Sequence, residues 1–192
     1  KQRFPDVNVR KRVFPLGPFA RKSDALAVRS KPKDPKLFLC VGTIEPRKNH
    51  KYLLRSFDQL WRANSDVKLV IVGREGWKCA DIMLRIRSHP MLGKKLFFKV
   101  ETDDFKLRQL YDRAGTVITC SFAEGYGLPI VEAVALDCAI LASRIPAHLE
   151  FALPSRNYFN LDDNLDLAKK IGQASVDPSH FKCSLHSLNN VV

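Results

Sequence analysis

The stretch Leu37-Phe38-Leu39-Cys40-Val41-Gly42 (residues 37–42) decides the fold, because it is a short apolar run that ends at a glycine. A run this short, with no polar residue alternating in it, is typical of a strand that is buried on both faces. Asn49 and His50 then open a segment with apolar residues at helical spacing: Leu53, Leu54, Phe57, Leu60 and Trp61. This spacing predicts an amphipathic helix of about four turns directly after the strand.

The strand–helix unit repeats along the chain. Further strands are predicted at residues 67–73, 96–100, 116–119 and 139–142. Helices are predicted at 80–87, around 107–114 and at 129–136, with weaker signals at 148–152 and 165–171. Strands that alternate with helices in this way predict an α/β fold, a Rossmann-like parallel sheet with helices on both faces. Ligands of such sheets bind beyond the carboxyl ends of the strands, so we expect a site in the loops after Gly42, Gly73, Val100 and Thr119.

The bulk composition fits one ordinary α/β domain. The chain has 192 residues, of which 45% are hydrophobic, and its mean hydropathy is −0.18. It contains no apolar run near the ~18 residues that a membrane span needs. The chain begins with Lys1-Gln2-Arg3, and no apolar stretch follows, so no signal peptide is visible. Because the first residue is not a methionine, we expect the natural start to lie before Lys1. The five cysteines form no C-x-x-C pair, which argues against a zinc site and favours a reducing, cytoplasmic location.

The basic charge is concentrated at the start of the chain. Residues 1–36 contain 11 Lys and Arg against three Asp, a net +8 of the total +12, together with five of the 11 prolines. We therefore predict a basic linker at 1–34, a folded domain at 35–174 and a weakly patterned tail at 175–192. The basic segment is either a solvated connector or an arm that binds anionic lipid, on the inner face of a membrane, or nucleic acid without sequence specificity.

Two common nucleotide-binding motifs are missing. A dinucleotide fold would place G-x-G-x-x-G after the first strand, but residues 42–47 read Gly-Thr-Ile-Glu-Pro-Arg. A P-loop, G-x-x-x-x-G-K-[S/T], occurs nowhere in the sequence. Simple NAD enzymes and Walker-type NTPases are therefore disfavoured.

Two other loops carry residues that suit a phosphorylated sugar. Arg47 and Lys48 follow the first strand, beside a helix start. The forked guanidinium of an arginine and the ammonium charge of a lysine are both suited to bind a diphosphate there. The second loop is Glu124-Gly125-Tyr126-Gly127-Leu128-Pro129, and the helix after it contains Glu132. Its glycines permit close backbone approach to a ligand, and Pro129 fits the first turn of a helix. The two carboxylates flanking this helix start are suited to bind sugar and ribose hydroxyls.

The segment from Glu124 to Glu132 resembles the E-x7-E signature of the family 4 (group 1) retaining glycosyltransferases, which have the two-domain GT-B fold. Residues 37–48, 69–73, 110–111 and 146–150 fit the same family in order and spacing, and the resemblance runs from about Pro15 to Ile171. Residues 13–17 resemble the end of the family's N-terminal domain. The chain is thus expected to be the C-terminal, nucleotide-sugar-binding half of a GT-B enzyme, and its own N-terminal domain an expected partner.

The resemblance also implies roles for individual residues. Lys48 and Arg47 would bind the donor diphosphate, with backbone N–H groups of Gly127 and Leu128. Glu132 would hold the ribose, and Glu124 would contact the transferred sugar as the catalytic residue. The remaining donor-loop positions are Gly73, Gly125, Tyr126 and Pro129. Many members have an arginine where this chain has Thr43, and Arg47 is expected to compensate.

The expected function is therefore donor binding for transfer of a hexose, with mannose as the candidate, from a nucleotide diphosphate sugar to a glycan or lipid-linked acceptor in polysaccharide assembly. Neither a metal nor another cofactor is expected. We expect little or no transfer by this chain alone, because the missing domain supplies the acceptor site. The alternatives are a non-catalytic module that binds through its basic arm, and an epimerase or phosphorylase-like GT-B enzyme for which no catalytic group can be placed. The five histidines match no triad or metal spacing and are expected to be structural or on the surface.

Overall fold

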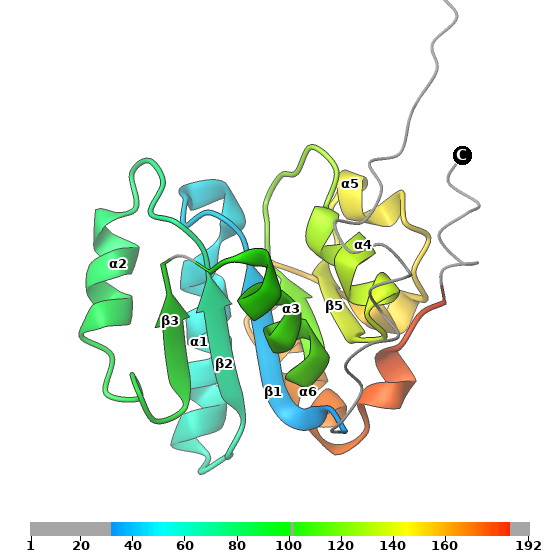
Figure 1. The fold of residues 1–192 in the computed structure, drawn as a ribbon, viewed down its shortest axis with the longest axis horizontal. Coiled ribbons are helices and arrows are strands. Elements are labelled where there is room, and N and C mark those ends of the chain that lie inside the picture. Colours follow the sequence, from blue (N-terminus) through cyan, green and yellow to red (C-terminus); the bar gives the residue numbers. More distant parts are fainter. Residues whose placement is uncertain (1–31, 101, 185–192) are drawn as a thin grey trace, which may run out of the picture.

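The computed structural model describes residues 32–100 and 102–184, which form a six-stranded sheet with helices on both faces (Figure 1). The strand order is β3-β2-β1-β4-β5-β6, and every neighbouring pair is parallel. The strands are β1 (Asp34–Val41), β2 (Lys68–Val72), β3 (Leu96–Lys99), β4 (Ala114–Thr119), β5 (Ala139–Ser143) and β6 (Tyr158–Phe159). The predicted Rossmann-like fold class is confirmed.

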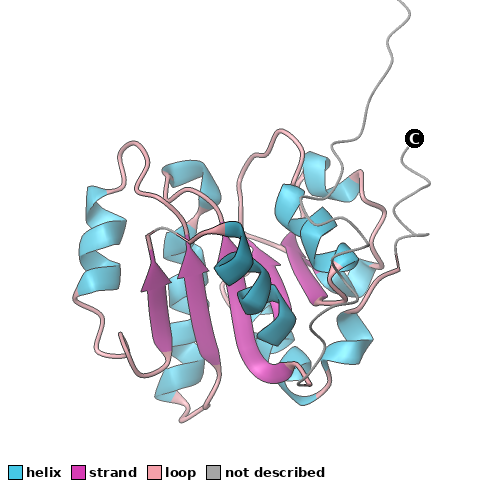
Figure 2. Ribbon diagram, viewed as in Figure 1, coloured by secondary structure: helices cyan, strands magenta, loops and turns pink. Residues whose placement is uncertain are grey.

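Each crossover contains a helix, as a parallel sheet requires. The α-helices are α1 (His50–Arg62), α2 (Ala80–Arg87), α3 (Asp104–Arg113), α4 (Leu128–Ala135), α5 (Pro146–Leu149) and α6 (Asp166–Val176). Three short 3-10 helices complete the described part: η2 (Pro46–Lys48), η3 (Ser155–Asn157) and η4 (Pro178–Phe181). Figure 2 shows the resulting three layers, with α3 in front of the sheet and α1 behind it.

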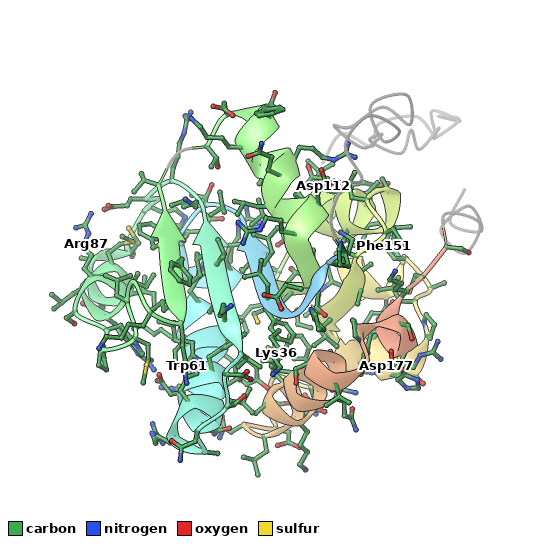
Figure 3. The ribbon with its side chains drawn as sticks, turned by 60° about the horizontal axis from the view of Figure 1, so that its bottom comes forward. Lys36, Trp61, Arg87, Asp112, Phe151 and Asp177 are labelled. Carbon is green, nitrogen blue, oxygen red and sulfur yellow. The ribbon has the colours of Figure 1, made fainter. Side chains whose placement is uncertain are left out.

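Alternation along β1 divides the core between the two faces. Phe38 and Cys40 pack in the cluster under α1, α2 and α6, whereas Leu37 and Leu39 pack in the cluster under α3 and α4. Successive side chains of a strand point to opposite faces, so an unbroken apolar run is what a sheet covered on both sides needs. Trp61, labelled in Figure 3, closes the far end of α1, where its indole N–H donates to the Val67 carbonyl at 2.8 Å.

The domain extends beyond both predicted boundaries. At the start, β1 begins at Asp34, and Lys33 Nζ donates to the Tyr111 carbonyl at 2.5 Å. The remainder of the predicted basic linker, residues 1–31, lies outside the described residues, as do 185–192.

The prediction of a tail from residue 175 was wrong for its first residues. Helix α6 continues to Val176, and Phe181 of η4 is buried in the core at 1% exposure. The buried Asn157 amide donates to the carbonyls of Phe181, at 2.6 Å, and of Ile140, at 2.8 Å. One aromatic anchor and one amide therefore hold this segment, and neither produces a periodic sequence pattern.

Strand β6 was also not predicted, because two residues are too short for a recognisable run. Strand β6 pairs with β5, and Phe159 lies opposite Ser143. Among the described helices, none has the length and apolar character that crossing a bilayer requires.

Replacing Phe181 with alanine tests whether η4 belongs to the folded unit. Because the ring is fully buried, we expect Phe181→Ala to lower the free energy of unfolding by roughly 3–5 kcal/mol. Urea denaturation followed by circular dichroism measures this, with Val176→Ala as the control because Val176 is 85% exposed. Equal effects of the two substitutions would show that η4 does not contribute to the core.

Candidate active site

The loops after β1 and β4 meet at the carboxyl edge of the sheet, where the strand order places these two strands side by side. The backbone N–H of Phe122 donates to the carbonyl of Arg47 at 2.7 Å, which fastens one loop to the other. Through this contact the predicted diphosphate residues of the first loop lie against the predicted catalytic loop. The structure therefore brings together two segments that are 76 residues apart in the sequence.

Glu124 is the centre of this junction. Lys48 Nζ donates to Glu124 Oε1 at 2.6 Å, and Arg47 Nη1 donates to Glu124 Oε2 at 3.0 Å. The Ser121 hydroxyl, at 2.5 Å, is a third donor to the same carboxylate. The Glu124 side chain is only 6% exposed, and that of Lys48 is 15% exposed. The carboxylate is therefore held by charged partners in a region largely screened from water.

The environment keeps Glu124 ionised. Burial acts to raise the pKa of the carboxyl, but hydrogen bonds from Lys48 and Ser121 and the charges of Lys48 and Arg47 outweigh it. The net shift is downward from the ordinary value. Glu124 is thus set up as an anion that interacts with cations or hydroxyls, not as an acid that supplies a proton.

The start of α4 lies directly beyond this carboxylate. Gly127 precedes the helix with φ +108°, a conformation that side-chain-bearing residues rarely adopt. A Cβ at Gly127 would also lie 3.0 Å from the Phe151 ring. No side chain caps α4, and no described protein group accepts the N–H of Gly127 or Leu128. Pro129 occupies the second helical position and has no N–H.

Glu132 occupies a separate place, one turn into α4. Its Oε2 accepts a 2.5 Å hydrogen bond from the hydroxyl of Tyr111, a residue of α3 that is 2% exposed. Burial raises the pKa of the Glu132 carboxyl, partly offset by the Tyr111 hydrogen bond. The two predicted carboxylates therefore face different neighbours: Glu124 faces the loop after β1, and Glu132 faces α3.

Packing against the end of β1 requires a glycine at position 73. A Cβ there would lie 1.9 Å from the carbonyl oxygen of Gly42, so only glycine lets the ends of β1 and β2 run this close. Gly125 differs, because a Cβ built at Gly125 would meet no atom within 4 Å. Tyr126 packs against Phe151 at a ring separation of 5.3 Å and is thereby turned toward the protein.

His148 is the site residue whose role the sequence did not reveal. It is fully buried in α5, and its Nδ1 lies 2.9 Å from the Ser143 carbonyl, to which it donates as Nδ1–H. The Ser143 hydroxyl in turn donates to the Ser121 carbonyl at 2.7 Å, which supports the loop that carries Glu124. Burial lowers the pKa of His148, so the ring is neutral at pH 7. The expectation that the histidines are structural fits this residue, but its structural task is to support the site.

Comparison with known proteins decides the family. The sequence profile of the glycosyl transferases group 1 matches residues 22–182. The chain belongs to this family. It is 39% identical over 134 residues to the serotype-specific mannosyltransferase WbdA of Escherichia coli, an alignment that covers 70% of this chain but 16% of WbdA. The chain thus spans about one sixth of the length of that relative.

Two solved structures show how much of a glycosyltransferase the domain represents. The C-terminal domain of the group 1 family protein LpcC from Francisella tularensis superposes with TM-score 0.67 at 20% identity, covering 91% of this chain and 93% of that domain. The pneumococcal O-GlcNAc transferase GtfA, solved with UDP and GlcNAc, gives TM-score 0.62 at 16% identity, covering 84% of this chain and 35% of GtfA. The group 1 domain described here therefore has the fold of one half of a GT-B enzyme.

The ionised state of Glu124 predicts how stability depends on pH. Its folded pKa is lowered, so its contribution is present above the unfolded pKa and is lost as the pH falls through the folded pKa. We expect Glu124→Gln to reduce the loss of stability between neutral and acidic pH. Urea denaturation across this range measures it, with Glu150→Gln as an exposed-carboxylate control. Parallel pH profiles for wild type and Glu124→Gln would contradict the ion-pair interpretation.

Proposed function

We propose that this domain binds the nucleotide diphosphate sugar donor of a retaining glycosyltransferase that transfers a hexose in polysaccharide assembly. The observation that carries the proposal is the junction at Glu124. There, two cations, one buried carboxylate and the uncapped start of α4 lie together at the carboxyl edge of a parallel sheet. This edge is where such folds bind nucleotides.

The donor diphosphate would bind by exchanging partners with Glu124. A diphosphate brings more negative charge than one carboxylate, so it competes effectively for Lys48 and Arg47. The N–H groups of Gly127 and Leu128 would donate to its remaining oxygens. Release from the cations would turn Glu124 toward the hydroxyls of the transferred sugar, while the cations stabilise the charge that develops on the departing diphosphate.

Glu132 would hold the ribose of the nucleotide. Tyr111 fixes one carboxylate oxygen of Glu132, and no other described group bonds to this carboxylate. Vicinal hydroxyls are suited to bind the second oxygen, as they bind acidic residues in dinucleotide folds. Tyr111 would then act as a positioning residue that orients Glu132 through the contact between α3 and α4.

A second domain would cover this edge of the sheet. Large apolar side chains are exposed around it: Trp77 after β2, Val100 after β3, Phe105 on α3, Phe122 after β4 and Leu128 on α4. Apolar groups gathered in this way mark a contact surface. Gly125, which no described neighbour requires, would leave room for the donor or that domain.

The proposal also concerns which sugar and which base the donor contains. The relative WbdA is named a mannosyltransferase, which supports mannose as the transferred hexose. GtfA was solved with UDP, so both GDP and UDP merit testing as ligands of this domain. Among the described residues, no three His, Cys, Asp or Glu side chains gather as a metal site requires. Independence of a metal stays a prediction.

The proposal predicts weak nucleotide binding by the chain itself. We expect GDP or UDP to bind, and Lys48→Ala and Glu132→Ala each to weaken that binding roughly tenfold, since each removes a charge-assisted contact. Isothermal titration calorimetry with the full chain measures this. Asp162→Asn is the control, because it alters an exposed carboxylate on the loop after β6. Absence of any nucleotide binding at millimolar concentration would refute donor binding by this domain.

A further inference from the structure

A pocket lies beside the Glu124 junction, lined by other residues. It has a volume of about 340 Å³ and opens between the N-terminal ends of α1 and α2. Lys48, Glu124, Gly127 and Glu132 do not line it. Its size is that of a pocket for a small molecule. The donor-binding residues described above leave this pocket without a function.

Both helices that reach the pocket begin without a side-chain cap. Helix α1 has 13 residues and α2 has eight, and neither first turn receives a side-chain hydrogen bond. The first N–H groups of a helix have no partner within it, and they carry the positive end of the helix dipole. Two such ends directed at one pocket favour an anionic ligand.

The side chains around the pocket leave positive charge uncompensated. Arg55 and Lys78 line it, and neither forms an ion pair with any described residue. The two acidic residues of the lining already have partners. Glu45 is bound by Arg47 and by the Trp77 indole N–H, at 3.1 Å, and Asp81 lies 3.8 Å from Lys51.

Two buried polar residues, Asn49 and His50, line the pocket. Asn49 is 8% exposed, and its side chain makes no cap hydrogen bond to α1. His50 is 2% exposed, and both of its ring nitrogens are unpaired. Burial lowers the pKa of His50 to about 4, so its ring is neutral at pH 7. Buried polar groups are normally paired, so the unpaired ring nitrogens of His50 at this pocket are consistent with a ligand there.

We propose that this pocket binds a sugar phosphate. Arg55, Lys78 and the first N–H groups of the two helices bind the phosphate, because each supplies positive charge or a donor. The neutral amide of Asn49 donates to and accepts from a sugar hydroxyl. Phe122, which is 59% exposed at the rim, offers an apolar surface to the ring face of the sugar. The proposal does not depend on donor binding at Glu124.

Titration of the full chain with a hexose 6-phosphate tests the proposal, by calorimetry and by chemical-shift mapping of backbone amides. We expect the largest shifts at residues 49–51 and 78–82. The double variant Arg55→Gln/Lys78→Gln should weaken binding at least tenfold, since both charged contacts are lost. Arg62→Gln is the matched control, an exposed cation at the opposite end of α1 with no ion pair among the described residues.

Three comparisons decide between this pocket and other sources of binding. Lys48→Gln should leave hexose 6-phosphate binding unchanged while weakening GDP or UDP binding. If Lys48→Gln weakens hexose 6-phosphate binding as well, the ligand lies at the Glu124 junction and the proposal is overturned. Inorganic phosphate that binds as tightly as the hexose 6-phosphate would overturn the sugar contacts. Hexose without phosphate binding equally well would overturn the anion site. No hexose 6-phosphate binding at millimolar concentration would overturn both.

Discussion

The pairing of Glu124 with Lys48 and Arg47 is the interaction on which the organisation of this edge depends. Lys48 and Glu124 are both largely removed from water, so neither charge would be tolerated there alone. The pair therefore fixes the loop after β1 and the loop after β4 in one arrangement. The same groups are the ones that a diphosphate and a sugar would engage. Within the protein, the charges of Lys48, Arg47 and Glu124 compensate one another.

A series of hydrogen bonds from the buried His148 supports this arrangement of the two loops. His148 bonds to Ser143, Ser143 bonds to the carbonyl of Ser121, and the Ser121 hydroxyl bonds to Glu124. The middle link joins the end of β5 to the loop after β4, and the other two lie within the segments that follow these strands. The position of the Glu124 carboxylate is consequently set in part by the buried side chains of Ser143 and His148.

Much of the fold and of the candidate site could be predicted from the sequence. The runs at β1, β2, β4 and β5 are apolar and end at turn residues, so both the strands and the parallel topology follow from pattern. The loops after β1 and β4 could be predicted to meet because adjacent strands end at the same edge. Gly127 and Leu128 could be placed at a helix start because Pro129 follows them.

The remaining features depend on single contacts between distant residues, which leave no periodic signal. The anchoring of Phe181 rests on one ring and on the Asn157 amide. The role of His148 rests on which carbonyl its Nδ1 faces. Gly73 was assigned to the donor loop, whereas its position is explained by the Gly42 carbonyl that a side chain would strike.

The strand order has a consequence for how the chain acquires its structure. β1 is the first strand in sequence but lies in the middle of the sheet, between β2 and β4, and α6 packs over it and over α1. These contacts join residues separated by much of the domain, and such non-local pairing slows folding. During synthesis the apolar run of β1 leaves the ribosome early and waits for α6, the last long helix, before one of its faces is covered. The domain is therefore most vulnerable to aggregation before its own chain is complete.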